Sequence, residues 1–501
     1  MASTAEVIDA LDEIAAARRD FVHCEFEEAV ERAGSVLGRA GLPAQLYQSA
    51  EMISMIGMVN GRDTFHARSR ATEMLAGDES HAYNETDLIG ARTTMAFAAR
   101  DEGRVSEALE MLRGITWSIN TPSRDGRNIF ARMGLAAMLT SVGDFDEAER
   151  LIVQSEVEVE LTGDGMWAAA PDIARARLLL ARGNLDGAVV HAELGRIIAS
   201  GLGNEFFVLV TDCVRALIAL QRGDVVEAAE RLDRAASHLP SNPPQYPVSY
   251  MRARARLAAA RGDPAGALRA LTPSDSGERP RDWLVVDLAV DAGWCVRTAL
   301  AANAPLQAEG IVVRSEVAAA HSPGQPAVVA AALHARGLFE RDPELLSRAA
   351  ATGVHGWQRA SAAEDAGVIL AERRRTADAG TAFARAARAY DGSGAVRDAE
   401  RVRARARDLT PVRRTPHKAR PRWGWTSLTG TEHEVALNVA EGLTNVRVAR
   451  RMFLSRHTVD FHLRQIYRKL GIRSRVELTR LVIEHDATTR DGTVRLSSPA
   501  P

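Results

Sequence analysis

The sequence predicts an all-α protein built from two kinds of helical unit, and three observations support this. A phrase with one glycine and one alanine at fixed places recurs every 39 or 40 residues through the middle of the chain. Near the C-terminus, helix-capping residues and glycines delimit four short helices. The charge is also divided, because residues 412–485 carry a net +9 and residues 1–411 carry −11. The two units are therefore expected to bind different partners.

Five repeated phrases predict five helical hairpins. They read DEGRVSEALEML, SVGDFDEAERLI, ARGNLDGAVVHA, QRGDVVEAAERL and ARGDPAGALRAL. In chain order, their glycines and alanines are Gly103, Gly143, Gly183, Gly223 and Gly262, and Ala108, Ala148, Ala188, Ala228 and Ala267. Each glycine can end a helix in the left-handed conformation, the Asp or Asn that follows most of them can cap the next helix, and the alanine lets the two helices approach closely.

Weaker copies extend this pattern across residues 1–408, to a total of ten or so hairpins. They lie at 25–37, 61–75 and 339–350, with further helices from Gln358 to about Arg407. The hairpins resemble tetratricopeptide repeats, although their period is longer than that family's usual length of about 34 residues. The resemblance implies a curved TPR-like α-solenoid whose concave surface binds a ligand or a protein partner. The alternative is a bare spacer or dimerisation arm.

Four helices can be assigned between Leu428 and Leu478 from their capping residues. The capping residues are Thr429 with Glu432, Thr444, Ser455, and Ser474 with Glu477, and the glycines that end helices are Gly442 and Gly471. In the third helix, apolar residues fall at i, i+4, i+7 and i+11, which predicts a single buried stripe: Val459, Leu463, Ile466 and Leu470.

A helix, a sharp turn and a second helix with a basic outer face form the arrangement that places the later helix in the major groove of double-stranded DNA. The third helix is therefore predicted to read the DNA. Its polar side carries Arg456, His457, Arg464, Arg468 and Lys469. The order LTxxE, EGLTN, LSxxTV, KLG and SRVEL resembles the LuxR/NarL-type helix-turn-helix (HTH) domain of bacterial transcription regulators, over residues 422–487.

The resemblance implies roles for individual residues. Base edges would be contacted by Asp460, Phe461, Arg464 and Gln465. Phosphates would be contacted from helix N-termini and basic side chains by Thr444, Asn445, Ser455, Arg456, Thr458, Arg468 and Lys469. Asp460 either accepts a hydrogen bond from cytosine, stays solvated or braces Arg464. Phe461 either touches a thymine methyl or packs within the domain.

The remaining segments predict a linker, a tail and a cytoplasmic protein. Residues 409–421 are basic and contain three prolines, which indicates a linker, and the polar residues 488–501 are predicted to be a disordered tail. Three isolated cysteines, Cys24, Cys213 and Cys295, indicate neither a disulfide framework nor a zinc site. Neither a signal peptide nor an apolar run of 18 residues occurs, so we expect no membrane segment and a cytoplasmic location.

No catalytic motif is present, since GxxxxGK[ST], HExxH and GxSxG are all absent. We therefore predict that the chain is not an enzyme and needs no cofactor. Helical repeats followed by a LuxR-type domain resemble the large ATP-binding LuxR regulators of the MalT kind, without a counterpart of their ATPase domain in this sequence. The resemblance implies a sequence-specific transcription regulator that senses a ligand or protein partner and binds DNA as a homodimer. The alternative is a TPR-like scaffold protein whose HTH domain mainly assists assembly.

Overall fold

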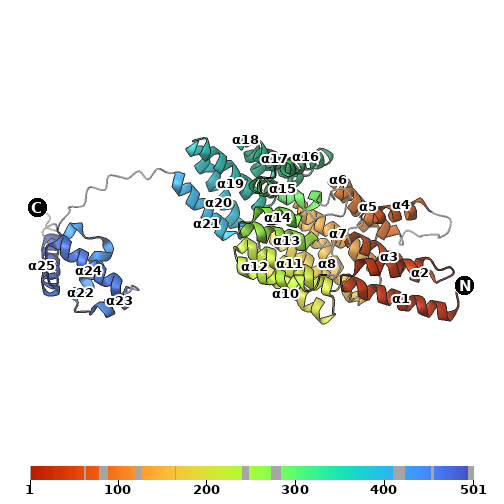
Figure 1. Cartoon of the computed structure of the whole chain (residues 1–501), viewed down its shortest axis with the longest axis horizontal. Coiled ribbons are helices and arrows are strands. Elements are labelled where there is room, and N and C mark those ends of the chain that lie inside the picture. Colours follow the sequence, from red (N-terminus) through yellow and green to blue (C-terminus); the bar gives the residue numbers. More distant parts are fainter. Residues whose placement is uncertain are drawn as a thin grey trace, which may run out of the picture. The chain divides into compact units, whose positions relative to one another are not determined.

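The computed structural model describes residues 2–60, 64–77, 88–119, 126–163, 165–239, 248–271, 284–409, 424–452 and 456–494. These residues contain helices and no strand, which confirms the predicted fold class. The chain divides into two compact units, Met1–Thr410 and Pro411–Pro501 (Figure 1). Within the described ranges, no helix combines the length and the apolar character that crossing a bilayer would require.

The first unit is a succession of helical hairpins, in which each helix packs against the next (Figure 1). Ten hairpins, α1–α2 through α19–α20, can be followed in the described residues, and α21 packs against α20. The helices are α1 (Thr4–Val22), α2 (Phe26–Leu37), α3 (Ala44–Asn60), α4 (Thr64–Ala76), α5 (Leu88–Asp101), α6 (Val105–Ser118), α7 (Arg127–Val142), α8 (Phe145–Thr162), α9 (Ala170–Arg182), α10 (Leu185–Gly201), α11 (Glu205–Arg222), α12 (Val225–Ala236), α13 (Val248–Ala260), α14 (Pro264–Leu271), α15 (Leu284–Ala301), α16 (Pro305–His321), α17 (Pro326–Phe339), α18 (Pro343–Thr352), α19 (Gly356–Glu372), α20 (Thr376–Gly392) and α21 (Val396–Leu409).

The five predicted hairpin junctions form as expected. Their glycines have φ between 79° and 89°, in the left-handed region where an L side chain is strained. The side chains of Asp144, Asn184 and Asp224 each accept a hydrogen bond from the amide three residues later, at 3.5, 3.0 and 2.9 Å. The five alanines are fully buried between the paired helices. The first junction has Arg104 at the cap position, and its side chain makes no capping hydrogen bond.

The same junction recurs where the sequence carries no glycine. Cys24, Asn303, Arg341 and Arg374 adopt φ of 66°, 57°, 56° and 61° between the paired helices. After Asn303 and Arg341, the next amide donates to a carbonyl five residues back, at 2.9 and 2.8 Å, as it does after Gly143 at 2.9 Å. The same hydrogen bond therefore ends these helices although no glycine is present to indicate the junction in the sequence.

Successive turns of the solenoid also contact one another. Helix α15 packs against α5 and α7, and α16 packs against α6. The amide of Ser106 donates to Ser322 Oγ at 3.1 Å, and His355 Nε2 lies 2.8 Å from the carbonyl oxygen of Ser141. Further along, the side-chain amide of Gln221 donates to the carbonyl of Ser393. Hairpins four to six positions apart therefore lie against each other, and the repeats wind closely around their own axis.

The second unit contains the four predicted helices and a short 3-10 turn, η1 (Trp425–Ser427). The helices are α22 (Gly430–Ala440), α23 (Asn445–Arg451), α24 (Arg456–Leu470) and α25 (Arg475–Val494). Their common core includes Val435, Val448, Val459, Ile466 and Leu478, all of them fully buried. Helix α25 continues past residue 487, where the domain was predicted to end, because neither a proline nor a glycine interrupts the chain before Gly492.

Candidate nucleic-acid interface

Helix α24, the predicted reading helix, is fixed in place by its buried stripe. Val459, Leu463 and Ile466 are at most 5% exposed and pack into the core of the second unit. The opposite side of α24 therefore faces outward, and Arg456, Phe461, Arg464 and Arg468 on it are all exposed. The described part of the structure thus brings together several of the predicted base and phosphate contacts on one exposed helix face.

Two side chains near the middle of α24 have the accessibility that base contact requires. Phe461 is 51% exposed, so it does not pack into the core, and its ring meets the neighbouring His462 ring at 5.8 Å. Arg464 is exposed, and its Nε donates to the backbone carbonyl of Asp460 at 3.4 Å. One turn further on, Arg468 donates to the side-chain oxygen of Gln465. Of the two roles expected for Phe461, packing into the domain core is not observed, and contact with a thymine methyl stays a prediction.

Asp460 has a partner that the sequence did not indicate. Its carboxylate accepts a 2.7 Å hydrogen bond from the side-chain amide of Asn445 at the start of α23. The side-chain oxygen of Asn445 in turn accepts a hydrogen bond from Arg475 at 2.9 Å, and Arg475 also donates to the backbone carbonyl of Leu443. This chain of contacts ties the start of α23 to α24 and to the start of α25. The Asp460 carboxylate is therefore held by Asn445, whereas Arg464 contacts only the backbone carbonyl of Asp460.

Lys469 is also engaged within the domain. Its ammonium group lies 2.6 Å from Glu432, whose side chain is only 6% exposed. Burial opposes ionisation of Glu432, but the hydrogen bonds from Lys469 and Thr429 outweigh it and lower the pKa of this carboxyl. The pair joins the end of α24 to the capping box at the start of α22, where Thr429 and Glu432 bond each other's amides at 2.7 and 3.3 Å. A phosphate contact by Lys469 would have to compete with this ion pair.

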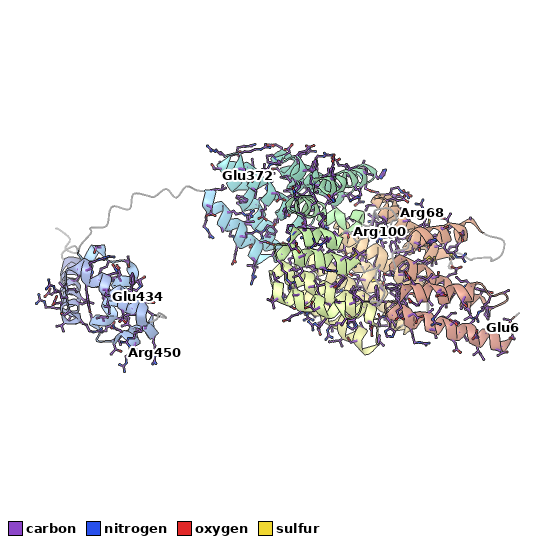
Figure 2. The ribbon with its side chains drawn as sticks, in the orientation of Figure 1. Glu6, Arg68, Arg100, Glu372, Glu434 and Arg450 are labelled. Atoms are coloured by element: carbon purple, nitrogen blue, oxygen red, sulfur yellow. The ribbon has the colours of Figure 1, made fainter. Side chains whose placement is uncertain are left out.

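The remaining predicted contacts lie at the N-terminal ends of α23 and α24. Thr444 is exposed and caps α23 through a 3.4 Å hydrogen bond from the amide of Arg447. Thr458 is half-buried, and Arg450, which was not among the predicted contacts, projects from α23 at the surface of the unit (Figure 2). Ser455 lies outside the described residues, as does the side chain of His457. Arg475 was missed by sequence reasoning because its partners are 30 and 32 residues away, where no local pattern marks them.

Comparison with known proteins identifies the type of this domain. Residues 426–482 match the family described as bacterial regulatory proteins, luxR family. A Mycobacterium bovis protein whose name describes it as an HTH-type transcriptional regulator is 51% identical over 61 residues, which make up 12% of this chain and 7% of that protein. The nitrate/nitrite response regulator protein homolog of Haemophilus influenzae is 42% identical over 60 residues, 12% of this chain and 29% of that protein. The recognised resemblance to LuxR-type domains is confirmed, within a small part of each relative.

Two solved structures resemble a large part of the chain. A Rap protein in complex with competence and sporulation factor matches 80% of this chain and 97% of its own, at 9% identity and a TM-score of 0.38. The apo form of the quorum sensor NprR from B. thuringiensis matches 73% of this chain and 99% of its own, at 10% identity and a TM-score of 0.33.

Proposed function

We propose, because residues 426–482 form a domain of the luxR type, that this chain is a sequence-specific DNA-binding transcription regulator. The observation that carries the proposal is the outer face of α24, where Phe461, Arg464 and Arg468 are exposed on a helix held by a packed core. The major groove of double-stranded DNA admits one helix, and arginine is the side chain that most often reads guanine there. In the proposal α24 enters the groove and the N-terminus of α23 meets the phosphate backbone.

Replacing Arg464 by alanine should cost about 1–3 kcal/mol of discrimination at one base position, because a bidentate contact to a base edge would be lost. A gel-shift panel on DNA fragments in which each position of the bound site is varied in turn measures this directly. Arg468→Ala should instead weaken binding to all sequences alike and flatten the salt dependence. Arg269→Ala is the control, since Arg269 is 73% exposed on α14 of the repeat unit and pairs there with Asp263. Unchanged base preference in the Arg464 variant would remove α24 from the role of reading helix.

We further propose that the regulator binds DNA as a homodimer. One small helical domain supplies few base contacts, so useful affinity requires two copies on neighbouring half-sites. The exposed face of α25 offers apolar contact area for a second copy, because Val476 and Ile483 are 78% and 62% exposed. The solenoid is the other candidate for this contact.

The full-length chain should therefore bind a fragment with two half-sites in a concentration-dependent step. Residues 411–501 alone should bind the same fragment more weakly if the solenoid supplies the dimer contact, and equally well if α25 supplies it. Light scattering alongside the gel shift gives the stoichiometry. A full-length protein that is monomeric on DNA and binds no better than the isolated unit would contradict both the homodimer and a regulatory contribution from the solenoid.

The repeat unit is proposed to sense a ligand or a protein partner and to pass that signal to the DNA-binding unit. What supports this role is a large cavity within the repeats, about 1680 Å³ in volume. A ligand can shift the DNA-binding equilibrium only if it binds one state more tightly than the other. Any effector must therefore favour either the DNA-bound or the free state of the protein.

A further inference from the structure

A row of exposed apolar side chains runs across the second helices of three successive hairpins in the repeat unit. Trp117 on α6, Val157 on α8 and Ile197 on α10 are 89%, 50% and 55% exposed. These residues are 40 positions apart, as are the glycines of the junctions that precede them, so they occupy one equivalent position in successive repeats. In the next hairpin the equivalent residue is Ser237, which ends the row.

Four more apolar side chains widen this row along α8 and α10. Val153 and Leu161 lie one turn before and one turn after the row on α8, and they are 45% and 69% exposed. Val190 and Leu194 lie two turns and one turn before it on α10, and they are 56% and 43% exposed. Residues one turn apart share a face of a helix. The seven side chains, called here the apolar patch, are Trp117, Val153, Val157, Leu161, Val190, Leu194 and Ile197.

The three helices that carry the apolar patch are neighbours in the fold. Helix α7 packs against α6 and α8, and α9 packs against α8 and α10. Arg113 on α6 donates to Glu147 on α8 at 2.6 Å. Gly165 lies just beyond the end of α8, where an added Cβ would stand 3.6 Å from Leu202, the residue that follows α10. The apolar patch therefore spans adjoining hairpins on one side of the repeat unit.

The apolar patch is large enough for a stable protein–protein interface. At the exposures given above, its seven side chains present on the order of 700 Å² of mostly apolar surface, whereas the largest apolar patch of a typical monomer covers about 300–600 Å². A specific interface buries about 800 Å² on each partner, of which about 56–58% is apolar. Burial of this patch in a single contact would supply the apolar area that such an interface needs.

The charge around the apolar patch suits a second copy of the same chain. Residues 1–411 carry −11, so two copies repel each other over much of their surface. Beside the patch, Arg150 and Glu160 are both exposed on α8, and their charges cancel. On α10, Glu193 pairs with Arg196 at 2.5 Å. These four charges sum to zero, so two copies can approach here without the repulsion expected elsewhere on the unit.

We propose that the apolar patch is the surface through which two copies of this chain form a homodimer about a two-fold axis. The proposal rests on the homodimer proposed above, and it places the contact on the solenoid instead of α25, where Val476 and Ile483 offer less apolar area. A two-fold interface uses the same surface on both copies, and a neutral apolar patch is complementary to itself. The dimer forms without DNA and presents two DNA-binding units to one fragment.

Analytical ultracentrifugation of the full-length protein without DNA should show a monomer–dimer equilibrium as the concentration is raised. Val157→Glu and Ile197→Glu should each increase the dimer dissociation constant at least tenfold, because each substitution buries one carboxylate from each copy inside the contact. Both side chains are at least half exposed, so the variants should fold, and circular dichroism checks this. Trp117→Ala removes apolar area without adding charge and should also increase the dissociation constant.

Val313→Glu is the matched control, because Val313 is 49% exposed on α16, outside the apolar patch, and its dissociation constant should not change. Val476→Glu tests α25 in the same way. Loss of the dimer in either of these variants, with an unchanged dimer in the folded Val157 and Ile197 variants, would overturn the proposal.

A full-length protein that stays monomeric at every concentration would also overturn the proposal and leave the apolar patch to a different partner. Gel shifts of the same samples report DNA binding separately. Failure of the dimer surface and failure of the proposed DNA-binding function are therefore distinguishable.

Discussion

Replacing Asp365 by alanine should destabilise the repeat unit by about 3 kcal/mol, at the lower end of the range for removing one partner from a buried ion pair, because the Arg297 side chain is 37% exposed. Asp365 lies on α19 with 8% of its surface exposed, and it accepts from Arg297 on α15 and meets His334 Nε2 on α17 at 2.8 Å. Without the carboxylate, the Arg297 guanidinium loses its counter-charge inside the solenoid. Denaturant unfolding of the full-length variant measures the loss.

A matched control is Asp378→Ala on α20, where the carboxylate is 56% exposed and pairs with Arg375 at the surface. Its loss should cost less than about 1 kcal/mol. The pH dependence is a second test. Burial opposes ionisation of Asp365, but Arg297 and His334 outweigh it and lower its pKa in the folded protein. The stabilisation that ionised Asp365 gives the folded protein is therefore complete above the pKa of about 3.9 that the group has in the unfolded chain. It is lost as the pH falls through the lower pKa that the group has in the folded protein. Equal stability of the Asp365 variant and the wild type at pH 7 would contradict this reading.

Ala148→Trp should destabilise the repeat unit by about 3 kcal/mol or more, at the upper end of the range for overpacking. Ala148 is fully buried in the core cluster, at the point where α8 starts back along α7 after the Gly143 junction. A tryptophan there must displace the neighbouring helix or adopt a strained rotamer. Thermal and denaturant unfolding of the full-length variant give the change in stability.

Ala384→Trp is the corresponding control, because Ala384 is exposed on α20 and the added ring can extend into solvent. It should change stability by less than about 0.5 kcal/mol. Full stability of the Ala148 variant, with the control unchanged, would show that the alanine does not set the spacing of its hairpin.

Local chemistry made the hairpin units predictable. A glycine in the left-handed region, a capping Asp or Asn and a buried alanine act within one junction, so their spacing reveals the period directly. The sequence pattern is weaker at the junctions of Asn303, Arg341 and Arg374, because these residues adopt the left-handed conformation in place of glycine, at some cost in strain. Nothing in the sequence marked the contacts between turns or the cavity, since these depend on how much each hairpin rotates relative to the last.

The second unit shows the same division between local and long-range information. Capping boxes and the apolar stripe of α24 were predictable because each lies within a few residues along one helix. The partners of Asp460 and Lys469 were not, because Asn445 and Glu432 are 15 and 37 residues away along the chain. The basic side chain of Lys469 is therefore less available to a phosphate than its charge alone suggested. Exposure in the folded domain is the better guide to which side chains can contact DNA.

The contacts between turns make the number of repeats a fixed quantity. In an array whose units touch only their neighbours, a unit can be added or removed with little effect on the others. Here Ser106 meets Ser322 and Ser141 meets His355, across 216 and 214 residues of chain. Inserting one hairpin between them would shift every later residue past its partner, as adding a strand would break the register of a closed barrel. A change in the number of hairpins therefore preserves the contacts between turns only if it adds or removes a whole superhelical turn.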